Sequence, residues 1–242
     1  MKDNIIQKDL ELLKEKYPDN LDEVLKQIDN GYPIQYLIGN VEFLDSNILV
    51  NENVLIPRYE TEYLVDKTIN YLKGKENLKI LDIGTGSGCI AISLKKVINC
   101  NVTAIDISPK ALEVAKDNAK RNNVEIKFIE KDILNNDIEG IYDVIISNPP
   151  YVAYNEEVDI KTKYEPQNAI FSDNNGLIFY ENILKKSVNH INKNGLIAFE
   201  IGMTQGRDIK SLALKYYKNA KVTIEKDLTN RDRYIFIFLN NE

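Results

Sequence analysis

The stretch Asp82-Ile83-Gly84-Thr85-Gly86-Ser87-Gly88 decides the fold of this chain, because it joins a short apolar run to an apolar helical stretch. The run Lys79 to Ile83 is typical of a buried strand, and Cys89 to Ile98 predicts a helix. Three glycines at alternate positions let a ligand press against the backbone of the connecting loop. We therefore expect a nucleotide-like cofactor here, with contacts from Gly84, Thr85, Gly86, Ser87 and Gly88.

Asp106 supports this interpretation, because it follows the next predicted strand, Asn101 to Ile105. An acidic residue about 20 positions beyond such a loop typically accepts hydrogen bonds from ribose hydroxyls. A dinucleotide-dependent oxidoreductase is the natural competitor. Its fingerprint, GxGxxG or GxGxxA, needs a small residue where this chain has Cys89, whereas Gly88 comes one position too early. The spacing therefore disfavours a dinucleotide.

Strands and helices alternate from Lys79 onward, which predicts a mostly parallel sheet with helices on both faces. Ser108 as N-cap and Pro109 at the first helical position mark the start of one helix. We expect an α/β, Rossmann-like fold whose seven-stranded, mostly parallel sheet ends in a C-terminal antiparallel hairpin. The other expected strands are Glu125 to Ile129, Tyr142 to Ser147, Gly195 to Ile201, Lys221 to Lys226 and Arg233 to Leu239, and the later helices run from about Leu177 to Ile191 and from Gln205 to Lys218.

The residues before this sheet predict two smaller parts. Residues 1–30 carry leucines at helical spacing, broken at Pro18, and predict a short N-terminal segment of two helices. Residues 31–57 have a short, β-like pattern with turn residues at Gly31, Gly39 and Asn51, which predicts a hairpin linker. Residues 58–242 would then form the main domain.

The tetrapeptide Asn148-Pro149-Pro150-Tyr151 directly follows the apolar run that ends at Ser147. Ligands of open α/β sheets bind at the carboxyl ends of the strands, where this segment would lie. The Asn148 side-chain oxygen and the Pro149 carbonyl can accept the two hydrogen bonds of a planar NH2 group. The proline rings restrict the backbone and the Tyr151 ring offers a face for stacking. Because Asn-Pro also opens many loops, an ordinary turn is the alternative.

Composition narrows the classes of function. The chain has 242 residues, a net charge of −6 and a pI near 5.1, which argues against direct binding of nucleic acid through a basic surface. Cys89 and Cys100 have no zinc-ligand spacing and His190 is the only histidine, so we expect no metal site. The N-terminus, Met1 to Asn4, lacks the apolar segment of a signal peptide, and no apolar run could span a membrane. We expect a soluble, cytoplasmic protein.

Taken together, the GxGxG loop, Asp106 and the Asn-Pro-Pro-Tyr segment resemble class I methyltransferases that bind S-adenosylmethionine. Nearly everything after residue 30 is further similar to the release factor glutamine methyltransferases, the HemK/PrmC family. Matching segments occur in the family's order: Gly31 to Tyr36, Leu55 to Glu62, Asp82 to Gly88, Glu165-Pro166, Gly176-Leu177, Glu200 to Gly202 with Gln205, and Asp232-Arg233.

This resemblance implies a reaction and a set of roles. Such enzymes methylate the side-chain amide nitrogen (N5) of glutamine in the Gly-Gly-Gln motif of class 1 peptide chain release factors, which implies a role in translation termination. Asn148 and Pro149 would hold the glutamine NH2, and Pro150 and Tyr151 would shape the slot. Asn148 would also lie beside the cofactor. Asp132 is expected at the adenine amino group and Ile133 against its face, with a plain core position as the alternative for Ile133.

Three departures from the family pattern bear on these expectations. The N-terminal segment is shorter than the usual helical domain, which puts docking of the release factor in question. Tyr59 stands where proline is usual, and Asn174-Asn175-Gly176 replaces an Asp-Gly ending. Arg58, Glu60 and Glu62 could orient a ligand or simply cap a helix. We expect a monomer.

Two other functions are compatible with parts of the sequence. A methyltransferase could use the same tetrapeptide on an exocyclic amine of adenine or guanine in nucleic acid, stacking the flipped base on Tyr151. The acidic composition disfavours this alternative. A binding module without catalysis could use the nucleotide pocket for sensing, but it would not require the intact Asn148 to Tyr151 segment.

Overall fold

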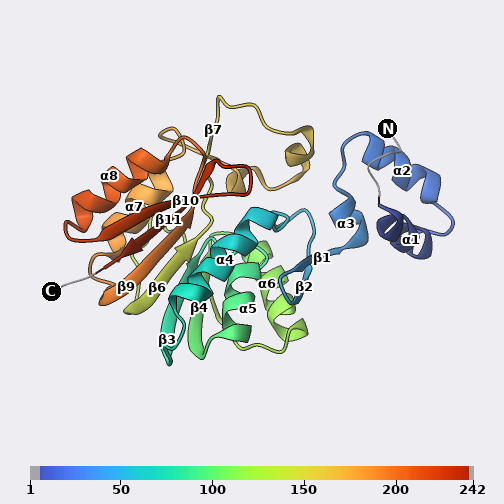
Figure 1. Ribbon diagram of the computed structural model, residues 1–242. Coiled ribbons are helices and arrows are strands. Elements are labelled where there is room, and N and C mark those ends of the chain that lie inside the picture. Colours follow the sequence, from blue (N-terminus) through green and yellow to red (C-terminus); the bar gives the residue numbers. More distant parts are fainter. Residues whose placement is uncertain (1–5, 240–242) are drawn as a thin grey trace.

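A seven-stranded sheet forms the centre of the protein (Figure 1). The structure, a computed structural model, describes residues 6–239. The strand order is β10-β11-β9-β6-β3-β4-β5, in which β9, β6, β3, β4 and β5 are parallel and the two final strands are antiparallel. This confirms the predicted α/β sheet with its C-terminal hairpin. The strands are β3 (Leu78–Ile83), β4 (Cys100–Asp106), β5 (Lys127–Glu130), β6 (Tyr142–Ser147), β9 (Ile191–Glu200), β10 (Lys221–Lys226) and β11 (Asp232–Phe238).

Helices cover both faces of the sheet, because alternate side chains of its buried strands point in opposite directions. Ile80 of β3 belongs to the core under α4 (Tyr59–Tyr71), α5 (Cys89–Val97) and α6 (Pro109–Arg121). Its neighbour Leu81 belongs to the opposite core, under α7 (Ile178–Ser187) and α8 (Gly206–Tyr216). Figure 1 shows the two helical layers on either side of the strands. As predicted, Ser108 caps α6 by accepting a hydrogen bond from the Ala111 N–H, and Pro109 opens the helix.

The order of strands places two predicted motifs beside each other. After β3 the chain continues outward to β4 and β5, and it then returns to the other side of β3 to form β6. Leu81 pairs with Ile145 in parallel register, so β3 and β6 end at the same edge of the sheet. This is the switch point of an open α/β sheet, where ligands bind. The glycine loop and the Asn148 to Tyr151 segment therefore meet there.

The N-terminal part contains α1 (Gln7–Lys16), α2 (Leu21–Asp29) and α3 (Ile34–Ile38), followed by an antiparallel hairpin of β1 (Asn40–Phe43) and β2 (Ser46–Leu49). The three helices share a small core of Leu13, Val24 and Leu37, and they lie to one side of the sheet (Figure 1). Asn118 of α6 holds the hairpin, since it exchanges hydrogen bonds of 2.6 and 3.0 Å with the backbone of Leu49. The division at residues 30 and 57 stays a prediction, and its outer ends, residues 1–5 and 240–242, lie outside the described residues.

Two predicted elements were wrong in detail. The segment 34–38 is helical rather than β-like, and it ends where Gly39 adopts a φ of +91° and its N–H bonds to the Gln35 carbonyl. The helix expected to reach Ile191 stops at Ser187. The residues that follow join the sheet instead. The His190 carbonyl accepts a hydrogen bond from the Tyr142 N–H, and Ile191 pairs with Tyr142 at the start of β9. Within residues 6–239, no helix is long and apolar enough to cross a membrane.

Candidate active site

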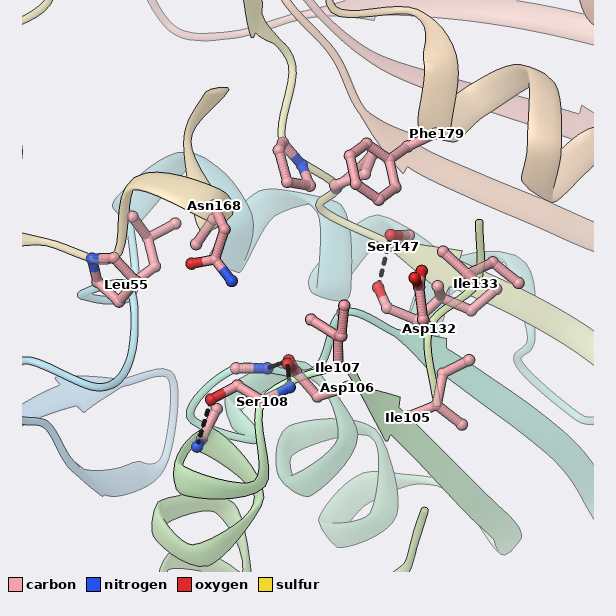
Figure 2. A pocket seen from close by; sticks show the side chains of 18 of the residues that line it. Leu55, Ile105, Asp106, Ile107, Ser108, Asp132, Ile133, Ser147, Asn168 and Phe179 are labelled. Atoms are coloured by element: carbon pink, nitrogen blue, oxygen red, sulfur yellow. Dashed lines mark hydrogen bonds between the residues drawn. The ribbon is translucent and has the colours of Figure 1, made fainter. Parts of the chain in front are cut away.

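The glycine loop and the Asn148 to Tyr151 segment border a cavity at the carboxyl ends of β3, β4 and β6 (Figure 2). The Ser147 hydroxyl at the end of β6 donates to the Ile83 carbonyl at the end of β3 over 2.6 Å, which connects these two strands. The space around this cavity, open solvent at its mouth included, is about 960 Å³. We call it the first cavity. The residues predicted from the sequence that line it are Gly84, Gly86, Asp106, Asp132, Ile133, Asn148, Pro149 and Pro150.

Gly84 and Gly86 leave room for a ligand at the backbone of the loop. Both have positive φ, +71° and +54°, and a Cβ on either would meet no atom within 4 Å. The missing side chains therefore open onto the cavity instead of onto packed protein. Any larger residue would project into this space, so the loop fits a cofactor held against its backbone.

Asp106 ties the loop to the end of β4. One carboxylate oxygen accepts the Gly86 N–H over 2.8 Å, and the other accepts the Ser108 N–H over 2.9 Å (Figure 2). Burial raises the pKa of this carboxyl, while the backbone hydrogen bonds act in the opposite direction. Each oxygen retains a further lone pair. The carboxylate can therefore accept hydrogen bonds from hydroxyl groups in the cavity.

Asp132 and Ile133 also lie on the wall of the first cavity, where Figure 2 shows them together. The Asp132 carboxylate accepts hydrogen bonds from the Leu134 N–H at 2.8 Å and from the Asn135 amide at 2.5 Å, so it also shapes the local turn. Ile133 is 5% exposed and packs into the core beneath α7. Ile133 therefore occupies a core position on the wall of the cavity, and its contact with adenine stays a prediction.

Thr85, Ser87 and Gly88 are placed differently, outside the wall of this cavity. The Thr85 hydroxyl donates to Asp82 over 2.6 Å, and the Ser87 carbonyl accepts from Asn118 over 2.9 Å. Gly88 opens α5 against Ala115 of α6. Burial raises the pKa of Asp82 to about 7. In this structure these residues hold the loop in shape, and their direct contact with a cofactor stays a prediction.

Two hydrogen bonds from side chains of later segments fix the backbone of the Asn148 to Tyr151 segment. The Pro150 carbonyl accepts the Ser172 hydroxyl over 2.9 Å, and the Tyr151 carbonyl accepts the Gln205 amide over 2.9 Å. Among the hydrogen bonds of residues 6–239, none is made to the Pro149 carbonyl. Its hydrogen bond to a ligand stays a prediction.

Tyr151 lies in a second cavity, which adjoins the first. Its hydroxyl donates to Glu200 over 3.3 Å and accepts from Arg233 over 3.3 Å, and burial raises its pKa. The residues that line this second cavity are Leu55, Arg58, Asn148, Tyr151, Val152, Val158, Asp159, Thr162, Ala169, Ile170 and Glu200. Leu55, Asn148 and Ala169 line both cavities. Asn148 thus stands where two ligands, one in each cavity, would meet.

Comparison with known proteins identifies the family. Residues 62–169 match the Methyltransferase small domain. A release factor glutamine methyltransferase of Lactococcus lactis subsp. lactis is 42% identical over 94% of this chain and 87% of its own length. The chain belongs to the release factor glutamine methyltransferase family. A second member, from Flavobacterium psychrophilum, is 46% identical over 88% of this chain and 77% of its own length.

The fold agrees with membership in the release factor glutamine methyltransferase family. A methyltransferase from Pyrococcus furiosus superposes with a TM-score of 0.64 at 21% identity, covering 91% of this chain and 99% of that chain. At this identity the likeness concerns the fold alone, and it confirms the expected class I methyltransferase architecture.

The partners of several other side chains are visible only in the structure. Arg58 contacts Glu165 over 2.5 Å, and the other Glu165 oxygen accepts the Ile56 N–H over 3.0 Å. Glu165 is 4% exposed. Its bonds to Ile56 and Arg58 connect the linker to the loop that lines both cavities. The sequence had shown Glu165 as part of the family resemblance but without a partner. Glu60 is exposed on the first turn of α4, while Glu62 accepts the Leu44 N–H.

Gly176 packs against the Asn148 to Tyr151 segment, and we expect Gly176→Ala to destabilise the protein strongly. A Cβ at Gly176, where φ is +77°, would lie 2.0 Å from the Tyr151 carbonyl oxygen and 2.4 Å from the Gln205 amide nitrogen. Gly74 is a matched control, because its φ is +78° and a Cβ there would meet nothing within 4 Å. We expect Gly74→Ala to cost about 1 kcal/mol of unfolding free energy, from backbone strain alone, and Gly176→Ala at least about 2–3 kcal/mol more.

Denaturant unfolding of the two alanine variants measures this difference. Equal losses would show that the packing of Gly176 on the tetrapeptide contributes nothing beyond its φ.

Proposed function

We propose that this protein transfers a methyl group from S-adenosylmethionine to the side-chain amide nitrogen (N5) of the glutamine in the Gly-Gly-Gln motif of class 1 peptide chain release factors. The observation that carries the proposal is the position of Asn148 between the two cavities. The methyl donor would occupy the first cavity and the glutamine would enter through the second. The names of the relatives at 42% and 46% identity support the choice of substrate.

The first cavity suits the methyl donor. Gly84 and Gly86 offer open backbone, and Asp106 offers carboxylate oxygens suited to ribose hydroxyls. Asp132 and Ile133 lie together on the wall, as expected for residues beside the adenine. When bound, S-adenosylmethionine supplies an electrophilic methyl group on a sulfonium.

On the acceptor side, Asn148 and Pro149 provide two oxygens at the boundary between the cavities. The Asn148 side-chain oxygen and the Pro149 carbonyl would each accept one hydrogen of the glutamine NH2. Pro150 and Tyr151 restrict the slot, and their carbonyls are already held by Ser172 and Gln205. Such a site fixes the plane of the amide, so that its nitrogen faces the first cavity.

Positioning of the glutamine amide against the methyl donor would provide most of the rate enhancement. Amide resonance ties up the nitrogen lone pair, and two hydrogen bonds with an imposed orientation favour partial pyramidalisation toward the methyl carbon. A nitrogen–carbon bond forms as the carbon–sulfur bond breaks, and the electron pair of the broken bond stays on sulfur. The alkylated nitrogen is strongly acidic and loses its proton to water, so the mechanism requires no protein base.

Methylation of a nucleic-acid base is the second candidate, because the same two oxygens could hold an exocyclic amine. The surface beside the site disfavours it. A groove along the start of α4 and the turn between β10 and β11 is lined by the acidic residues Glu60, Glu62, Asp66 and Asp227. Carboxylates in this position repel a phosphate backbone. They are compatible with a basic protein partner.

The proposal extends to the organisation of the protein. Residues 1–30 would help to hold the release factor, residues 31–57 would link them to the sheet, and residues 58–242 would perform the transfer. The enzyme would act in the cytoplasm as a monomer, without a metal and without binding nucleic acid directly.

Incubation with methyl-labelled S-adenosylmethionine tests the function. The acceptors are a class 1 release factor, the same factor with alanine in place of the Gly-Gly-Gln glutamine, and total RNA. We expect label on the intact factor alone, located by mass spectrometry on the glutamine side chain. Label on RNA, or equal label on the alanine-substituted factor, would overturn the proposal.

A further inference from the structure

A chain of three hydrogen-bonding side chains runs from the candidate catalytic site into the core. The Asn148 side-chain nitrogen donates to the Thr61 hydroxyl over 3.1 Å, and that hydroxyl donates to a Glu200 carboxylate oxygen over 2.6 Å. Thr61 lies in the first turn of α4 and Glu200 at the end of β9, so the three residues come from separate elements. Thr61 is 3% exposed and Glu200 is 1% exposed.

The direction of these bonds determines how the Asn148 amide is turned. A hydroxyl carries one hydrogen, and the hydrogen of Thr61 is taken by Glu200. Toward Asn148 the Thr61 oxygen can therefore only accept, which selects the NH2 end of the amide. The opposite end, the oxygen of Asn148, accepts no hydrogen bond among those of residues 6–239. It is thus left for a ligand at the boundary between the cavities.

We propose that Thr61 and Glu200 are positioning residues, which hold the Asn148 amide with its oxygen toward the substrate NH2. This inference rests on the proposed function, because it assigns a purpose to that orientation. With the amide reversed, Asn148 would present its own NH2 to the substrate NH2, and two donors cannot bond to each other.

Glu200 is itself held in place from several sides. Its second carboxylate oxygen accepts the Tyr151 hydroxyl over 3.3 Å, and its backbone carbonyl accepts the Tyr180 hydroxyl over 2.8 Å. Arg233 contributes a positive charge and Glu60 a negative one, and burial raises the pKa of Glu200. The carboxylate therefore accepts from two side chains of fixed position. It cannot turn away from Thr61 without breaking the bond to Tyr151.

Thr61→Val tests the proposal, because valine keeps the shape of threonine and removes the acceptor. A buried amide donor without a partner is strongly disfavoured, so Asn148 would turn its NH2 toward the cavity. We expect kcat for release-factor methylation to fall at least about tenfold. The affinity for S-adenosylhomocysteine should stay within about twofold of the wild type, because Thr61→Val does not alter the residues proposed to bind it. Thr61→Ser retains the hydroxyl and should restore kcat to within about threefold of the wild type.

Thr68→Val is the matched control on the same helix. Thr68 is also buried, and its hydroxyl donates to the Leu64 carbonyl of its own helix, over 2.7 Å. Both valine variants should lower the melting temperature, whereas only Thr61→Val should lower kcat. An equal effect of the two variants on kcat would overturn the proposal, since it would reduce Thr61 to a structural role.

A double-mutant cycle with Asn148→Ala separates positioning from any other effect of Thr61. If Thr61 acts through Asn148, Thr61→Val should change kcat by less than about twofold once Asn148 is alanine. A full additional loss in that background would contradict the assignment. Wild-type enzyme measured in parallel distinguishes the two hypotheses: an inactive wild type refutes the proposed function, while an active wild type with additive variants refutes only the positioning role.

Discussion

Asn148→Ala should lower kcat for release-factor methylation by about 100- to 1,000-fold, the loss expected when a preorganised polar group at the reacting centre is removed. Its side-chain oxygen is the acceptor that would fix the glutamine NH2, and alanine provides no replacement. The affinity for S-adenosylhomocysteine should change by no more than about threefold, because Asn148 forms only one part of the wall of the first cavity. Single-turnover kinetics and calorimetry measure the two quantities separately.

Asn182→Ala provides the comparison for this variant. Asn182 is half-buried on α7, bonds to the Ile178 carbonyl over 2.9 Å and lines neither cavity. We expect its loss to affect stability and to leave kcat unchanged. Equal losses of kcat and cofactor affinity in Asn148→Ala, or no loss of either, would be incompatible with the role assigned to Asn148.

The sheet could be predicted from the sequence because its signals are local. Buried strands such as Tyr142–Ser147 read as short apolar runs, and the Ser108-Pro109 pair marks a helix start in any context. The five-residue helix α3 could not be predicted, since it is too short to show a helical period. The end of α7 was misplaced because the pairing of Ile191 with Tyr142 depends on a strand 49 positions earlier.

Candidate site residues could be proposed from the sequence only where they adjoin or keep a recognisable spacing. Asn148 and Pro149 carry their chemistry within one tetrapeptide, and Asp106 follows its glycine loop at a recognisable spacing. Thr61 bonds to Glu200 across 139 positions, and no local pattern indicates such a pair. Thr85 and Ser87 adjoin the glycines in sequence, yet the Thr85 hydroxyl bonds to Asp82 and the Ser87 carbonyl to Asn118. A glycine-rich motif therefore does not reveal which of its residues face a ligand and which face the protein.

Asp106→Ala is expected to weaken the binding of S-adenosylhomocysteine by about 100-fold, from the loss of charge-assisted hydrogen bonds to the ribose hydroxyls. The same change releases the Gly86 N–H, which the carboxylate holds at 2.8 Å, so the open backbone of the loop loses its fixed position. Isothermal titration calorimetry measures the affinity. At saturating cofactor, kcat should recover to within about tenfold of the wild type, because the described hydrogen bonds of the Asp106 carboxylate go to Gly86 and Ser108 and not to the Asn148 to Tyr151 segment.

Asp143→Ala removes a carboxylate with a similar structural task and no place at the cavity. Asp143 is the second residue of β6, and its oxygens accept the Lys79 N–H over 2.8 Å and the Asn192 amide over 2.6 Å. Both aspartate variants sever contacts that join neighbouring parts of the sheet, so both should lose stability. Only Asp106→Ala should lose cofactor affinity. If the two variants bound S-adenosylhomocysteine equally well, Asp106 would serve the loop alone, and the ribose would have to be held by another residue of the first cavity.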